Sequence, residues 1–412
     1  MAVIGMIAEF NPLHNGHIEI LDHANKELNA DYVVVVMSGD FTQRGNPAMI
    51  SKYDRAKLVL RHGADLVIEL PVIAATSSAE TFAKAGIAAL NATGCVHQLL
   101  FGCEDANMEM FRTAAHLASS DSMDYHKTIN SFVKQGDSYA VARQKAIAMQ
   151  QKGVTLPSDF LSKPNNILGV EYVKALSSDV YAIEPVCFPR TSSAHGSNSL
   201  SGSSASGSAI RNAMETNQAA SASPSVPDDV MKILRFNAQF KTLIRSADIS
   251  MLLHYKLLSE SDFTPYLDCS EDISNKINNT KDRFVEFENF CSLLKSKDLT
   301  YTRISRVLLH IALGITQEDL DNLAMCNYAP YLRILGFSKK GTTLLKTVKE
   351  RAKVPFFLSP QGGEGLLNEL EKRILKKDVY AGDLYRMLLT NKSGRVFPTE
   401  YTRKFEVKDI NG

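Results

Sequence analysis

The chain has 412 residues and a net charge of +1, with 44% hydrophobic and 22% charged residues. This composition is typical of a soluble globular protein, and the length predicts more than one hydrophobic core. The N-terminus lacks the basic start and apolar run of an export signal, and the six scattered cysteines form no Cys-x-x-Cys pair. We therefore expect a cytoplasmic protein and find no argument for a membrane segment, a zinc knuckle or a redox motif.

Strands and helices alternate over the first hundred residues. Short apolar runs predict strands at 2–8, 31–37, 65–70 and 97–102, and helical periodicity predicts helices at about 16–28, 51–60 and 77–92. The four valines at 33–36 are typical of a parallel strand covered on both faces. This order predicts an α/β fold with a Rossmann-like parallel sheet, in which ligands bind at the carboxyl ends of the strands.

The rest of the chain changes in character. Residues 107–176 are mostly helical by pattern, 180–188 are predicted as a last strand, and 191–210 contain nine serines and three glycines, typical of a flexible loop. A second low-complexity patch marks a linker at 218–227, beyond which the periods are helical with few strand signals. We therefore predict a catalytic domain over 1–217, a linker over 218–227 and an α-helical domain over 228–412.

The strongest local feature is His14-Asn15-Gly16-His17 at the first turn of the first helix. Histidines three residues apart share one face of a helix, and the helix start supplies free backbone amides for an anion. Gly16 leaves room for a phosphate to approach. We predict that His14 and His17 stabilise a transition state at an α-phosphate. The alternative is a capping loop with packed histidines; a zinc site is weaker, because no third ligand follows at a suitable spacing.

The H-x-G-H pattern after an N-terminal strand resembles the signature of the nucleotidyltransferase superfamily, of the HUP type. Other passages narrow the resemblance to the tRNA(Met) cytidine acetate ligase family, over essentially the whole chain. They are SGDFTQRGNPA (38–48), Lys52, Arg55, ADLVIELP (64–71), FGCE (101–104), KPNNIL (163–168) and YLRILGF (331–337).

The resemblance implies an ATP-dependent ligase that converts acetate to acetyl-adenylate and transfers the acetyl group to the wobble cytidine of elongator tRNA(Met), forming N4-acetylcytidine. Mg²⁺ is expected with the ATP, and no protein partner is indicated. The nucleotide site that it implies comprises Ile7, Ala8, Glu9, Phe10, Asn11, Pro12, Leu13, His14, Asn15, Gly16, His17, Ile18, Glu19, Ile20, Gly102, Asn165, Arg190 and Thr191.

Further polar residues are candidate contacts to phosphate or substrate. They are Asp40, Arg44, Lys52, Arg55, Ser206, Ser208 and Arg211. Ser206 to Arg211 resembles the S-x-S-x-I-R element of the superfamily, in which hydroxyls and an arginine at a helix start hold the triphosphate. For Arg44, Lys52 and Arg55 the alternative is an ordinary solvated charge, and for the serines an ordinary Ser-Gly loop.

The C-terminal half carries the positive charge. Residues 1–220 have net charge −4 and residues 221–412 have +5, and the window 333–353 alone has +6. We predict tRNA contacts at Arg333, Lys339, Lys340, Lys346 and Lys349, although such runs are more often solvated helix faces. Two other functions stay open: a nucleotidyltransferase for a small metabolite, and a tRNA-binding protein without catalytic activity.

Overall fold

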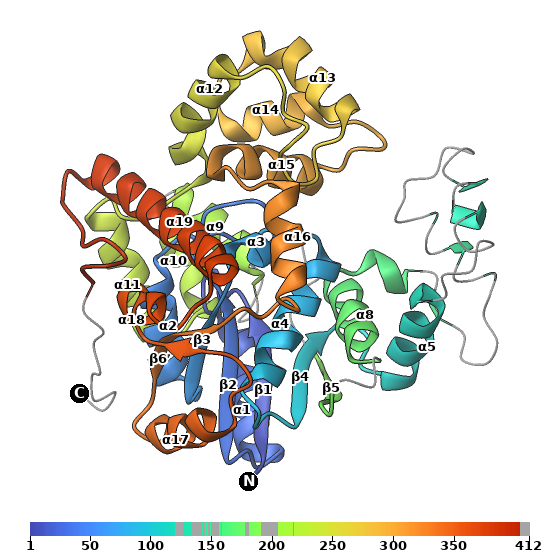
Figure 1. Ribbon diagram of the computed structural model, residues 1–412, viewed down its shortest axis with the longest axis vertical. Coiled ribbons are helices and arrows are strands. Elements are labelled where there is room, and N and C mark those ends of the chain that lie inside the picture. The colour runs from blue at the N-terminus through green and yellow to red at the C-terminus, as the bar shows by residue number, and fades with distance from the viewer. Residues whose placement is uncertain are drawn as a thin grey trace.

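The computed structural model describes residues 1–119, 127–129, 131–132, 142, 145–146, 149, 156–157, 159–177, 181–190, 205–216 and 218–403. Figure 1 shows a central sheet with helices on both faces and a group of helices above its upper end. None of the helices in these described ranges is long and apolar enough to cross a membrane.

Within the described residues seven strands form one sheet, in the order β5-β4-β1-β2-β3-β6-β7 (Figure 1). The five strands from the first half of the chain are parallel to one another, which confirms the predicted Rossmann-like sheet. Their bounds agree with the predicted runs to within a few residues and are β1 (Val3–Ala8), β2 (Tyr32–Ser38), β3 (Leu66–Leu70), β4 (Gln98–Cys103) and β5 (Glu184–Pro189).

The other two strands come from the region that was predicted to be helical. β6 (Leu332–Phe337) pairs antiparallel with β3, and β7 (Phe356–Phe357) continues the sheet beside it. The prediction of an α-helical region beyond residue 228 therefore needs a correction at this point. Arg333 made the short apolar run look exposed, but its charge is paired inside the protein with Glu69 and Glu400.

Side chains alternate between two apolar cores, one on each face of the sheet. Ile4 and Met6 of β1 belong to one core, whereas Val3 and Ile7 belong to the other. The first face is covered by α1 (Asn15–Asp22, continued by a π-helical turn His23–Glu27), α2 (Lys52–Arg61), α9 (Gly207–Glu215), α10 (Ala219–Ala222) and α11 (Asp228–Gln239). The predicted linker thus contains α10 and packs on this face, with Ala222 and Val226 buried.

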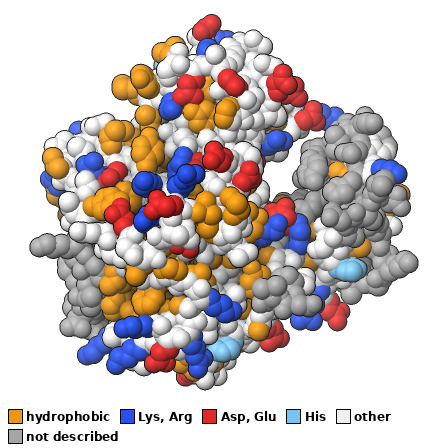
Figure 2. Space-filling model, in the orientation of Figure 1, with side chains coloured by type: hydrophobic (Ala, Val, Ile, Leu, Met, Phe, Trp, Pro, Cys, Tyr) orange, Lys and Arg blue, Asp and Glu red, His pale blue; other side chains and the backbone are white. Residues whose placement is uncertain are grey.

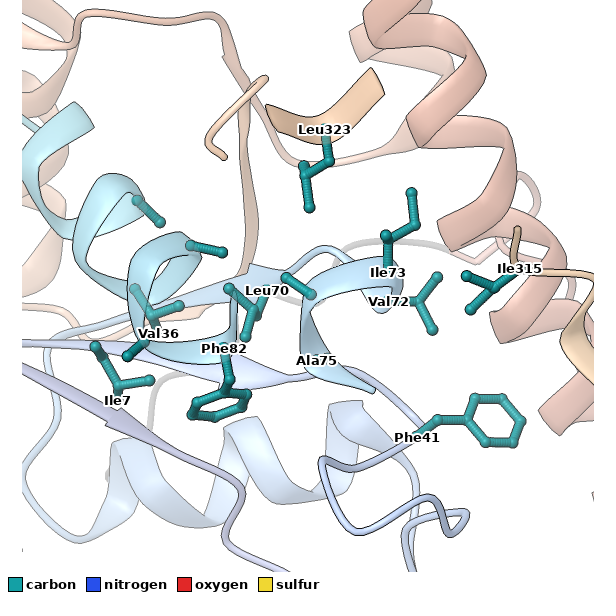
Figure 3. Packing of buried hydrophobic residues seen from close by; sticks show 14 of the residues in the cluster. Ile7, Val36, Phe41, Leu70, Val72, Ile73, Ala75, Phe82, Ile315 and Leu323 are labelled. Carbon is teal, nitrogen blue, oxygen red and sulfur yellow. The ribbon is translucent and has the colours of Figure 1, made fainter. Parts of the chain in front are cut away.

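The second face carries the larger core, part of which Figure 3 shows around Leu70 and Ile73. Its helices include α3 (Val72–Ala75), α4 (Ala79–Ala92), α5 (Met108–Ser119), α8 (Pro164–Leu176), α16 (Gln317–Met325) and α19 (Glu369–Ser393). Near the β6–β7 edge lie α17 (Gly341–Arg351) and α18 (Pro360–Glu364).

Four helices form the group at the top of Figure 1, which we call the helical cap: α12 (Ser250–Ser259), α13 (Glu271–Thr280), α14 (Phe287–Leu294) and α15 (Tyr301–Leu313). Two of them begin at residues that cap a helix well, because the side chains of Ser270 and Thr300 accept a hydrogen bond from the first turn. α15 ends at Gly314, whose φ of +66° suits a residue without a β-carbon. The apolar residues of the cap join the core of the second face.

Candidate active site

A cavity of about 450 Å³ lies where β1 and β4 end. It reaches both faces of the sheet, because Met6 and Leu100 line it from one face and Ile7 and Phe101 from the other. This is the carboxyl edge of the parallel strands, where ligands bind in open α/β sheets. The structure therefore has a cavity where the sequence predicted one.

His14 and His17 lie side by side in this cavity. Their rings are stacked with centroids 3.8 Å apart, and the ring of Phe10 meets His17 edge-on at 4.9 Å. His14 directly precedes the first residue of α1, and its backbone N–H donates to Nδ1 of His17 at 3.3 Å. Both imidazoles can therefore face one group at the start of the helix, where the backbone amides also favour an anion.

The side of the cavity next to α1 has two glycines, against which neighbouring side chains pack closely. A β-carbon on Gly16 would lie 3.3 Å from His14, and one on Gly102 would lie 3.0 Å from the side chain of Arg190. Arg190 donates to Asn165 Oδ1 at 3.4 Å, and Asn165 donates to Glu104 Oε1 at 2.7 Å. These residues bring the end of β4, the residue after β5 and the start of α8 to one wall.

The start of α9 supplies a second polar wall. Ser206 caps this helix by accepting from the N–H of Ala209, and its hydroxyl lies 3.2 Å from that of Ser208. Arg211 donates to the carbonyl oxygen of Asn11 at 2.6 Å and lines the cavity. Burial lowers the pKa of Arg211, an effect that the charge of Glu9 opposes. An anionic ligand here offsets the cost of burying this guanidinium.

The helical cap completes the cavity beside Arg44. Thr302 of α15 lines it together with Arg44 and Gln43. Gly45 has a φ of +80°, and a β-carbon on it would lie 2.5 Å from backbone atoms of Ser305 and Arg306. The loop that holds Arg44 therefore fits against α15 only with glycine at this position. Sequence reasoning did not single out either Gln43, which lies within the passage 38–48, or Thr302, which has no motif around it.

Lys52 and Asp40 are not in the cavity wall. Lys52 is 1% exposed and its Nζ lies 2.8 Å from Glu69 Oε1 and 3.0 Å from Glu400 Oε2. Asp40 accepts from the N–H of Lys52 at 2.7 Å, and burial raises its pKa to about 6. The prediction that Lys52 and Asp40 contact substrate is wrong, because their charged groups are buried and already bound in ion pairs and hydrogen bonds within the protein.

Arg55 also lies outside the cavity, fully buried behind it. Its guanidinium donates to the carbonyl oxygens of Glu9 (2.7 Å) and Ser38 (3.0 Å) and to that of Gly39. Glu9 and Gly39 directly follow β1 and β2, and Ser38 is the last residue of β2. Arg55 therefore positions the loop that carries the histidines and does not touch a ligand itself.

The residues of the predicted nucleotide segment divide into two sets. Those that line the cavity are Ile7, Ala8, Glu9, Phe10, Asn11, His14, Gly16, His17 and Ile20. Leu13 is fully buried in the core, and Pro12, Asn15, Ile18 and Glu19 do not belong to the wall. Thr191 and residues 191–204 of the predicted Ser-Gly loop lie outside the described residues.

The predicted tRNA contacts separate from one another in the structure. Arg333 is 2% exposed and is held between Glu69 and Glu400, so a contact between it and RNA is ruled out by burial. We call the exposed basic residues around α17 the α17 patch; it comprises Lys339, Lys340, Lys346, Lys349, Arg351 and Lys353. Figure 2 shows Lys and Arg gathered at the lower end of this face, over the place of α17 in Figure 1.

The α17 patch lies at the opposite end of the sheet from the cavity. Lys340 Nζ is 3.8 Å from Asp65 Oδ2, just before β3 begins, and Lys353 donates to Asn91 in the last turn of α4. Strands of five to seven residues separate the two ends by about 20 Å. The patch and the cavity therefore cannot bind the same few atoms of a ligand.

No group of three His, Cys, Asp or Glu side chains that could hold a metal ion occurs within the described ranges. Among the described residues that line the cavity, Glu9 is the only acid. The polar wall is thus formed by imidazole, hydroxyl, amide and guanidinium groups, which suit phosphate oxygens better than a metal ion.

Comparison with known proteins gives a consistent result. The family model of the HIGH nucleotidyltransferases matches residues 1–398. The chain is 34% identical over 392 residues to the tRNA(Met) cytidine acetate ligase of Caldanaerobacter subterraneus subsp. tengcongensis, covering 95% of this chain and 96% of that protein. It is 33% identical over 414 residues to the enzyme of the same name from Acetivibrio thermocellus, covering 98% and 99%.

Solved structures agree with the sequence relatives. The apo crystal structure of Thermotoga maritima TmcAL superposes with a TM-score of 0.87 at 29% identity, covering 94% of this chain and 95% of that one. A second structure of that protein, bound with alpha-thio ATP, gives a TM-score of 0.85 over the same fractions. The similarity extends over the sheet, the helical cap and the C-terminal helices, since almost all of both chains is covered.

Proposed function

The chain belongs to the tRNA(Met) cytidine acetate ligase family of HIGH nucleotidyltransferases, and we propose that it activates acetate with ATP and acetylates the wobble cytidine of elongator tRNA(Met). The observation that carries the proposal is the stacked pair His14 and His17 at the start of α1, inside a cavity with a cationic wall. The neighbour from Thermotoga maritima, whose structure holds an ATP analogue, supports ATP as the nucleotide.

In the first step a carboxylate oxygen of acetate attacks the α-phosphorus of ATP. The new P–O bond forms as the bond to pyrophosphate breaks, and no proton has to move. Negative charge increases around the α-phosphate, where His14, His17 and the amides of α1 are fixed in advance to stabilise it. Ser208 and Arg211 at the start of α9 are placed to bind the leaving pyrophosphate.

In the second step the exocyclic amine of the cytosine attacks the carbonyl carbon of acetyl-adenylate. AMP leaves with the C–O electrons, the amine loses a proton, and the product is an amide at N4. A base can reach a cavity of this kind only if it is turned out of its stack. Arg44 and Thr302 stand at the cavity where the helical cap meets the sheet, and we assign them to the wall that the tRNA approaches.

The α17 patch is a separate part of the proposal. Its exposed lysines suit the phosphate backbone of an RNA, and a tRNA is long enough to reach from the cavity past the end of the sheet. We assign Lys339, Lys340, Lys346 and Lys349 to such a distant, sequence-independent contact. Mg²⁺ enters with the ATP phosphates and is held mainly by them, in keeping with the scarcity of acids in the wall.

We also propose a cytoplasmic location, where ATP and tRNA meet; the six free cysteines agree with a reducing compartment. A small-metabolite nucleotidyltransferase is less well supported, because the named relatives match over the whole length and not over the sheet alone. A protein without catalytic activity is less well supported as well, since both histidines stand in the cavity.

The test is isotope exchange between pyrophosphate and ATP, with and without acetate, before any tRNA is added. Acetate-dependent exchange is expected. Labelled acetate should then pass to an elongator tRNA(Met) transcript and not to one with uridine at the wobble position. An exchange rate that is the same with and without acetate, or equal labelling of both transcripts, would contradict the proposed reaction.

A further inference from the structure

The part of the cavity on the second face of the sheet lies apart from the two histidines and from Arg211, which are on the side of the first face. We call it the apolar lobe; it is lined by Ile7, Ala79, Phe82, Phe101, Leu168 and Tyr172. Phe82 and Tyr172 are 2% exposed and Phe101 is 5% exposed. Figure 3 shows Ile7 and Phe82 next to each other between β1 and α4. The aromatic side chains that line the lobe are therefore almost wholly shielded from bulk water.

The packing of α8 shapes the lobe. Leu168 and Tyr172 are four residues apart and so share one face of this helix. The rings of Phe101 and Tyr172 meet edge-on, with centroids 5.8 Å apart. Gly169 allows this approach, because a β-carbon there would lie 2.6 Å from the ring of Phe101. The walls are thus fixed by close packing, so a small change in the size of a ligand should change its affinity strongly.

Tyr172 brings one polar group to the lining of the lobe, in a buried position. Within the described residues the hydroxyl of Tyr172 is buried and has no hydrogen-bond partner. Burial, and then the charge of Glu9, raises the pKa of Tyr172, so the hydroxyl keeps its proton and can donate. A buried hydroxyl without a partner is costly, and most buried polar groups have one. The unsatisfied donor therefore points to a ligand that supplies an acceptor.

Three features limit the ligand: a small apolar part, one acceptor next to it, and access to the α-phosphate in the same cavity. A cytosine or adenine ring fits poorly, because each carries several polar edge atoms and the lobe offers a single hydroxyl. A short carboxylic acid meets all three conditions. We propose that the apolar lobe binds the methyl group of acetate and that Tyr172 donates a hydrogen bond to one of its carboxylate oxygens.

This inference rests on the proposed function and adds the residues that select the acid. The hydrogen bond from Tyr172 leaves the second carboxylate oxygen free to attack the α-phosphorus beside His14 and His17. Phe82 and Phe101 close the lobe behind the methyl group and exclude longer acids. Glu9 also lines the cavity, and its Oε1 accepts a hydrogen bond from the N–H of Gln43 at 2.8 Å.

The experiment compares Tyr172→Phe and Phe82→Leu with the wild-type enzyme in the exchange of pyrophosphate with ATP, using acetate, propionate and butyrate. Tyr172→Phe should raise the KM for acetate about 10- to 100-fold, the range for a lost hydrogen bond to a charged group, and leave the KM for ATP unchanged. Phe82→Leu should shift the preference toward propionate about 10-fold or more. Tyr181→Phe, a tyrosine outside the cavity, is the matched control and should change neither constant.

Each alternative has its own outcome. A higher KM for ATP in Tyr172→Phe would mean that the lobe holds the adenine ring. Normal exchange with slow transfer to tRNA would mean that the lobe holds the cytosine ring. Either result overturns the inference. Unchanged KM for acetate overturns it while the proposed function stands. If the wild-type enzyme shows no acetate-dependent exchange, the proposed function fails. Saturation-transfer NMR of the acetate methyl group then tests whether acetate binds in the apolar lobe. A methyl signal that Tyr172→Phe abolishes supports the inference, and an equal signal in both proteins contradicts it.

Discussion

The hydroxyl of Ser305 donates a hydrogen bond of 3.0 Å to the carbonyl oxygen of Gly45, although the two residues are 260 positions apart. The same hydroxyl lies 3.1 Å from Asn46 Oδ1. Through these contacts α15 of the helical cap holds the loop that carries Arg44 against the cavity. The cap is therefore part of the site and does more than extend the surface of the protein.

Replacement of Gly45 tests this coupling. Gly45→Ala places a β-carbon where backbone atoms of α15 lie 2.5 Å away and disfavours the φ of +80°. The loop should move and take Arg44 with it, at a cost of about 1–3 kcal/mol in stability. We expect a lower kcat/KM in the exchange reaction and a larger loss in transfer to tRNA. Gly314→Ala, a left-handed glycine with no atoms near its β-position, is the control; equal effects from the two would contradict the coupling.

The buried ion pairs around Glu400 should make stability depend on acid. Burial favours the neutral form of Glu400, but the charges of Lys52 and Arg333 outweigh it and lower the pKa to about 2. A carboxyl whose pKa is lower in the folded chain adds stability above its unfolded pKa, near 4.5, and loses it as the pH falls toward 2. Glu400→Gln should therefore destabilise the protein by about 3 kcal/mol at pH 7.

Urea denaturation at several pH values measures this effect. The difference between Glu400→Gln and the wild type should shrink as the pH falls below 4.5, because the carboxyl of the unfolded chain takes up a proton there, whereas that of the folded chain does so only near pH 2. Glu350→Gln, an exposed acid on α17, should cost almost nothing at any pH. A constant difference across the pH range would mean that Glu400 acts by packing and not by its charge.

The α17 patch makes a prediction about salt. Lys346→Glu with Lys349→Glu should weaken tRNA binding and reduce the slope of log affinity against log salt by about 0.7–0.9 for each lost phosphate contact. Acetate-dependent exchange should survive, because the cavity lies at the other end of the sheet. Lys232→Glu with Arg235→Glu, exposed on α11, makes the same change in charge elsewhere. An equal loss of affinity in both double variants would remove any special role from the patch.

Much of the fold was readable from the sequence because its signals are local. Parallel strands buried on both faces appear as short apolar runs such as 33–36, and their order along the chain implies a Rossmann-like sheet. β6 escaped prediction because its second residue, Arg333, is charged, and the partners of that charge are far away in sequence. A buried charge paired over a long range has no local signature.

In the candidate site, too, the features with a local signal were predicted and those that depend on long-range packing were not. His14, Gly16 and His17 stand at a helix start, which is a local feature, and their spacing predicted that they would lie close together. Lys52 and Arg55 have the residue types of phosphate ligands, yet one is paired with buried acids and the other with backbone carbonyls. Tyr172 and Phe82 line the cavity from helices that the sequence gave no reason to bring together. Which polar residue faces a ligand is decided by tertiary packing.

We infer that His14 and His17 stabilise the transition state at the α-phosphate, and His17→Ala removes one of these two imidazoles. Loss of one preorganised donor typically lowers kcat by about 100- to 1,000-fold. The measurement is the rate of acetate-dependent exchange between pyrophosphate and ATP for His17→Ala, at saturating ATP and acetate and without tRNA. We expect His17→Ala to lose exchange activity by this factor and to melt at a temperature close to that of the wild type. An exchange rate within a factor of about three of the wild type, in a folded variant, would contradict it.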